Sequence, residues 1–111
     1  MRCEICNDGK EFDGTAGLNR HIGRMHPDED KFIRKVKRKY TGFVRALYRK
    51  LKKQNLPTEK IKWQIADYLV EKIQKDTQLM PYVQNMNRTV LSLVLYMAVN
   101  LIFRNISLGL V

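Results

Sequence analysis

Cysteine and histidine are scarce in this 111-residue chain, which has two residues of each type. The chain also lacks a glycine-rich phosphate loop, which excludes a nucleotide-binding enzyme built on that motif. Any nucleophile or general base that used a cysteine or a histidine would have to come from these four residues. The chemistry available to the protein therefore depends on where those four residues fall.

Long apolar runs are also missing. The most apolar stretch, residues 89–103, has fifteen uncharged residues between Arg88 and Arg104. As a helix it rises only about 22 Å, whereas the hydrocarbon of a bilayer is roughly 30 Å thick. We expect a helix buried in protein, and because two amphipathic helices can hardly wrap a third, we expect a homo-oligomer that shares it. A membrane-associated segment is the alternative.

Acidic residues are absent from residues 31–53, which hold eleven lysines and arginines. The net charge of the whole chain is +10, so the entire excess of positive charge lies in this segment. Its apolar residues recur at helical spacing, which predicts an amphipathic helix with a basic outer face. Such a concentration of cations repels itself unless an anionic partner screens it. Nucleic-acid phosphate is the commonest such partner, and anionic lipid is the second.

The two cysteines and two histidines all fall in the first quarter of the chain, in the pattern Cys-x2-Cys-x14-His-x4-His. Zn²⁺ takes four ligands in a tetrahedron and prefers thiolate and imidazole, which this spacing delivers. A disulfide would leave both histidines unused. We therefore predict one structural Zn²⁺ held by Cys3, Cys6, His21 and His26. A closed shell of four ligands leaves no position for water or substrate, so we do not expect an enzyme.

Between the ligands, Phe12 and Leu18 stand six residues apart. With these residues, segment 1–26 resembles the two-Cys, two-His zinc finger. The resemblance implies a small ββα unit that buries one aromatic residue and one leucine beneath the metal. The family usually has an aromatic residue where Met1 stands, so the first strand should be short. In size and layout the chain is also similar to the small zinc-finger proteins of archaea and their viruses.

Family members that read DNA place helix positions −1, 3 and 6 in the major groove. Alignment through Leu18 and His21 puts Gly14, Gly17 and Arg20 there, so Arg20 alone has a side chain able to contact a base edge. We expect poor direct readout and affinity that comes mainly from phosphate contacts. The predicted nucleic-acid-binding residues are Arg20, Arg24, Lys35, Lys37, Arg38, Lys39, Arg45, Arg49 and Lys52.

The predicted fold is mostly α, with a small ββα zinc finger followed by a bundle of about three helices. The finger should occupy residues 1–27 and the helical domain residues 28–111, joined by an acidic linker at Pro27–Asp30. The predicted helices are a basic amphipathic helix at about 31–54, a second helix at about 58–75 and an apolar helix at about 81–106.

Together these features predict a zinc-dependent protein that binds double-stranded DNA, serves as a transcriptional regulator and forms a homodimer through its apolar C-terminal helix. One alternative is a zinc-stabilised protein-interaction or oligomerisation module, which the glycines at the reading positions favour. Another is a protein that binds RNA or an anionic membrane. No signal peptide precedes Cys3, so we expect an intracellular protein, in the cytoplasm or nucleus, or inside a host cell if it is viral.

Overall fold

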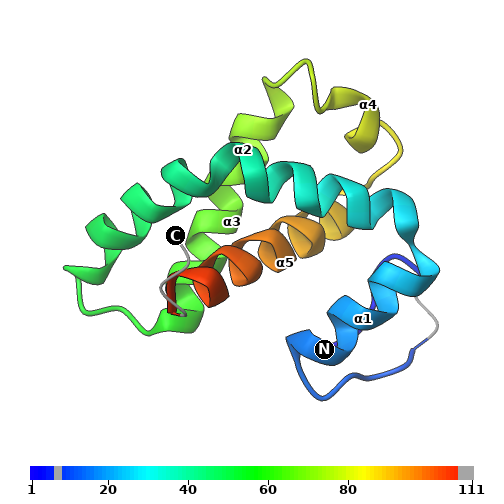
Figure 1. Ribbon diagram of the computed structural model, residues 1–111, viewed down its shortest axis with the longest axis horizontal. Coiled ribbons are helices and arrows are strands. Elements are labelled where there is room, and N and C mark those ends of the chain that lie inside the picture. Colours follow the sequence, from blue (N-terminus) through cyan, green and yellow to red (C-terminus); the bar gives the residue numbers. More distant parts are fainter. Residues whose placement is uncertain (7–8, 108–111) are drawn as a thin grey trace.

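A computed structural model describes residues 1–6 and 9–107, with side chains as far as Asn105. Residues 108–111 of the predicted helical domain lie outside this described part. Helices α2 and α5 run side by side, α3 crosses them, and α1 folds back beneath the first half of α2 (Figure 1). The helices are α1 (Thr15–Met25), α2 (Pro27–Lys52), α3 (Thr58–Gln74), α4 (Met80–Val83) and α5 (Arg88–Ser107).

The prediction of a ββα finger is wrong, because no strand forms among the described residues. A single isolated bridge joins Arg2 to Glu11. Beside it, the N-terminal ammonium of Met1 donates to the Phe12 carbonyl at 2.8 Å, and the Phe12 N–H donates to the Met1 carbonyl at 2.8 Å. The turn that carries Cys3 and Cys6 begins directly after the bridge on one side, and α1 begins three residues after Phe12 on the other. Too few residues therefore remain between turn and helix for a ladder.

Helix α2 begins earlier than the expected position 31. Its first residue is Pro27, whose missing N–H costs nothing in the first turn of a helix. Asp28, Glu29 and Asp30 follow in that turn, where negative charge is favourable. The acidic segment expected to be a linker is therefore helical, and His26 alone separates α1 from α2.

The apolar helix predicted at 81–106 is divided into α4 and α5. The side-chain oxygen of Asn87 accepts a hydrogen bond of 2.9 Å from the N–H of Val90, which caps the start of α5. Asparagine competes with helical backbone bonding in this way, so the helical pattern restarts at Arg88.

The hydrophobic core is continuous from the metal-ligand segment to the bundle. Seven consecutive residues of α5, Leu93–Val99, are buried, and α1, α2 and α3 all contact that helix. One copy of the chain therefore covers this part of α5, which removes the reason for expecting a homo-oligomer; an oligomer itself stays a prediction. None of the described helices has the length and apolar character needed to cross a membrane.

Candidate metal centre

The four predicted ligands meet at one point. One donor atom from each of Cys3, Cys6, His21 and His26 lies within 4.8 Å of the other three. The distance from Cys3 Sγ to His26 Nε2 is 3.5 Å, and the distance from Cys6 Sγ to His21 Nε2 is also 3.5 Å. A tetrahedral Zn²⁺ with ordinary Zn–S and Zn–N bonds requires sulfur and nitrogen atoms about 3.5 Å apart. The donor atoms therefore fit a four-coordinate metal ion.

The break between α1 and α2 is what brings the second histidine to the site. Residues five apart on a continuous helix point about 140° away from each other, so His21 and His26 could not share a metal there. Helix α1 ends at Met25 instead, and His26 has non-helical backbone angles of φ −134° and ψ 67°. Its N–H still donates to the Ile22 carbonyl at 2.8 Å, so the turn is closed. The bend thus turns the His26 ring toward Cys3.

Buried apolar side chains of α1 pack beside the ligand cluster. Cys3 is 2% exposed, and Leu18 and Ile22 of α1 are fully buried. The Phe12 ring is half-buried and lies 5.0 Å from the His21 ring, centroid to centroid. The cluster is therefore held between the N-terminal turn and the inner face of α1.

The predicted nucleic-acid-binding residues of α1 line a pocket to which α2 contributes no lining residue. Arg20 and Arg24 are both exposed and line a pocket together with Phe12 and His21. Helix α1 begins at Thr15, so Gly14 directly precedes the helix. Numbered from that start, positions −1, 3 and 6 are Gly14, Gly17 and Arg20.

A row of cations follows the outer face of α2. Positions 34, 38, 45, 49 and 52 fall within a narrow sector of the helix, opposite the buried Val36. We call these residues, Arg34, Arg38, Arg45, Arg49 and Lys52, the outer stripe. The Arg34 Nε pairs with Asp30 Oδ2 at 3.1 Å, and the other four make no ion pair with any described residue. Arg34 was missed in the sequence, although its spacing of four from Arg38 places it on this face.

Lys35, Lys37 and Lys39 lie outside the sector of the outer stripe, although Lys37 shares a pocket with Arg34 and Arg38. The Lys35 ammonium lies over the Tyr82 ring, 5.7 Å from its centroid. Lys37 lines a pocket between α1, α2 and α5. The Lys39 ammonium donates to Asp76 Oδ2 at 2.6 Å. The structure therefore places Lys35 and Lys39 in surroundings of their own and brings Lys37 together with Arg38.

Asp76 joins α2 to the end of α3. Besides the bond from Lys39, its carboxylate accepts hydrogen bonds from the Tyr40 hydroxyl at 2.6 Å and from the Gln78 N–H at 3.0 Å. These bonds, first that of Lys39, hold the pKa of Asp76 at about 2. Burial, followed by the bond to Asp76, raises the pKa of Tyr40 to about 12. Lys39 is thus engaged in an intramolecular network.

Comparison with protein-family models, with curated proteins and with solved structures found no significant match. The case for a metal centre therefore rests on the four donor atoms and their geometry.

Proposed function

We propose that this protein is a zinc-stabilised, DNA-binding protein that holds duplex DNA mainly through its phosphates. Support for zinc comes from the donor set, because two thiolates and two imidazoles at tetrahedral spacing suit Zn²⁺ better than the oxygen-preferring Mg²⁺ or Ca²⁺. With four protein ligands the ion has no open position, so we assign it a structural role and no catalysis.

The outer stripe of α2 is the observation that carries DNA binding. From Arg34 to Lys52 it extends for about 27 Å along the helix. A duplex presents one phosphate charge per roughly 1.7 Å of its axis, so the stripe faces many phosphates at once. Four of its five cations have no acidic partner among the described residues, and pairing with phosphate would neutralise them.

Low sequence selectivity is expected both from the reading positions at α1 and from the phosphate contacts of the outer stripe. Gly14 and Gly17 offer no side chain at two of the reading positions, which leaves Arg20 to contact a base edge. Phosphate contacts carry no sequence information directly. We propose a protein that binds broadly, with transcriptional regulation as its setting.

The zinc assignment is tested by loading the chain with Co²⁺, whose visible absorption reports the geometry and thiolate ligation of the ion. We expect a tetrahedral spectrum with sulfur-to-metal charge transfer, and competition by one equivalent of Zn²⁺. The Cys6→Ser variant should lose that spectrum, whereas the control Ser92→Ala, distant in sequence from all four ligands, should keep it. An octahedral spectrum in the wild-type chain would contradict the four-ligand site.

DNA binding is tested by titrating the zinc-loaded chain against a random-sequence duplex at two salt concentrations, with RNA and anionic liposomes in parallel. We expect tight duplex binding that weakens steeply with salt. The double variant Arg45→Gln/Arg49→Gln should lower the salt slope by about 2, since each lost phosphate contact removes about one unit.

The matched control for that variant is Lys60→Gln/Lys75→Gln, which removes the same charge from exposed positions at the two ends of α3. Its salt slope should stay close to the wild-type slope. Equal slopes for the two double variants would show that net charge, and not the outer stripe, governs binding. Tighter binding to RNA or to liposomes than to the duplex would transfer the proposal to that ligand.

A further inference from the structure

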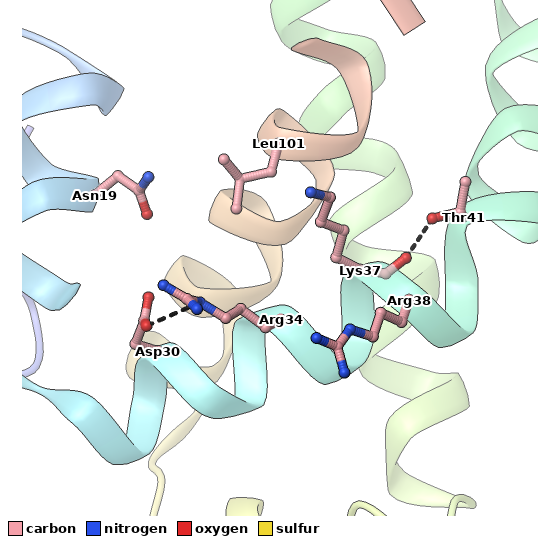
Figure 2. A pocket seen from close by; sticks show the side chains of 7 residues that line it. All are labelled: Asn19, Asp30, Arg34, Lys37, Arg38, Thr41 and Leu101. Atoms are coloured by element: carbon pink, nitrogen blue, oxygen red, sulfur yellow. Dashed lines mark hydrogen bonds and ion pairs between the residues drawn. The ribbon is translucent and has the colours of Figure 1, made fainter. Parts of the chain in front are cut away.

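A polar pocket of about 480 Å³ opens between α1, α2 and α5 (Figure 2). Asn19 of α1 and Lys37 of α2 extend into it from opposite sides, and Leu101 of α5 lies between them. Arg38 lines the same pocket one residue further along α2. The pocket therefore joins the segment that holds the metal ligands to the helical bundle.

The charge of this pocket is positive. Arg34, Lys37 and Arg38 supply three cations, and Asp30 supplies one carboxylate. The Asp30 carboxylate is engaged by Arg34 Nε, which leaves the terminal nitrogens of that guanidinium as donors. Lys37 and Arg38 form no ion pair with any described residue. The pocket thus combines uncompensated cations with the neutral amide of Asn19.

These groups suit a phosphate. An ammonium, a guanidinium and an amide N–H₂ are all donors, and phosphate oxygens are acceptors that guanidinium can bind in pairs. Leu101 gives one wall an apolar surface against which a sugar can pack. The volume falls in the range of small-ligand pockets, so a phosphate with its neighbouring sugars can enter. We propose that this pocket seats one backbone phosphate of bound duplex DNA.

This inference rests on the proposed DNA binding and names where one phosphate is held. It also gives the metal a function beyond folding the N-terminal segment. Asn19 belongs to α1, and the His26 ligand forms the bend that sets α1 against α2. The site is therefore complete only when the metal unit is folded, and Zn²⁺ would be required for the phosphate contact of Asn19.

One test uses inorganic phosphate as the probe and the NMR signals of the zinc-loaded full chain as the readout. We expect saturable shifts of the Asn19 side-chain amide and the Leu101 methyl groups. Lys37→Gln should abolish these shifts, and Lys50→Gln, an exposed cation of the same helix that does not line the pocket, should leave them intact. Unchanged Asn19 and Leu101 signals in the wild-type chain would overturn the pocket as a phosphate site.

A second test measures duplex affinity. Lys37→Gln should lower the salt slope by about 1, whereas Lys50→Gln should change it little. Asp30→Asn removes the one negative charge of the pocket and should tighten binding about threefold at low salt. A folding defect cannot tighten binding, so this gain separates a site effect from misfolding. The control Asp67→Asn changes an exposed carboxylate of α3 that lines a different pocket.

The outcomes separate this inference from DNA binding itself. Wild-type duplex binding with equal affinities for Asp30→Asn and Asp67→Asn would overturn the pocket and leave the outer stripe as the DNA contact. Absence of duplex binding by the wild-type chain at low salt would overturn the proposed DNA binding. It would also overturn the proposal that the phosphate in the pocket belongs to the DNA backbone. In that case shifts at Asn19 and Leu101 would still support a site for free phosphate.

Discussion

His26 is a candidate metal ligand and is also the residue at which α1 ends and α2 begins. It ends α1, and its carbonyl accepts the first backbone bond of α2, from Asp30 N–H at 3.0 Å. Its Nε2 atom lies at coordination spacing from Cys3 Sγ. The spacing of cysteines and histidines predicted the ligand, because coordination requires those residue types in that order. It did not predict the shared cap, because Pro27 and the acidic residues after it read as a linker.

Gly17 of α1 and Gly14, which precedes that helix, provide a stability test at the same scale. A Cβ atom on Gly17 would lie 3.7 Å from Phe12 Cδ1, an ordinary contact, and its backbone is helical. Gly17→Ala should therefore raise the free energy of unfolding by about 0.5–1 kcal/mol through helix propensity. Gly14 has φ 141° and ψ −173°, a conformation that L-residues rarely adopt. Gly14→Ala should therefore lower the free energy of unfolding. Denaturant unfolding of both zinc-loaded variants measures the two changes. A gain of stability in Gly14→Ala would contradict the assignment of a strained backbone at Gly14.

At the scale of elements, α2 uses its basic residues in different ways on different faces. The composition of residues 31–53 predicted a basic amphipathic helix, since charge and apolar spacing are local properties of the sequence. The network of Lys39 could not be predicted in this way, because its acceptor Asp76 lies 37 residues further along the chain. In the sequence Lys39 is one cation among many, and only the fold shows that a buried carboxylate lies beside it.

Replacement of Asp76 tests the contact between α2 and the end of α3. The folded chain holds the pKa of Asp76 at about 2, below its usual value of 3.8, so it binds this proton less readily than the unfolded chain does. The stabilisation is complete above about pH 4 and is lost as the pH falls toward 2. Asp76→Asn should lower the melting temperature at pH 6 by roughly 5 °C, the shift for a loss of about 1 kcal/mol.

The difference in melting temperature between wild-type chain and Asp76→Asn should then shrink as the pH is lowered from 4 to 2. Loss of metal in acid affects both proteins, so it does not enter this difference. Asp67→Asn, at an exposed position of α3, should melt close to the wild-type temperature throughout. A difference that stays constant down to pH 2 would show that ionisation of Asp76 does not contribute to stability.

For the whole molecule, the question is how the metal-ligand segment relates to the bundle. The sequence predicted helices and a ligand set, because helical spacing and ligand spacing are visible within short windows. It did not predict that α1 packs on α5, because those contacts join residues far apart in the chain. Leu18 and Ile22 belong to the same buried cluster as the residues of α5. The division at residue 27 into two domains stays a prediction, and the continuous core favours cooperative unfolding.

Removal of zinc tests that cooperativity. Trp63, the single tryptophan, stacks on Tyr96 with ring centroids 4.2 Å apart, so its fluorescence reports the contact between α3 and α5 rather than the metal site. If the core unfolds as one unit, a chelator should lower the melting temperature seen by Trp63, because Leu18 and Ile22 leave the core when α1 loses its metal. The chelator should not lower it further in Cys6→Ser, which lacks a ligand already. An unchanged Trp63 transition after chelation would contradict cooperative unfolding and show that the bundle is stable without the metal unit.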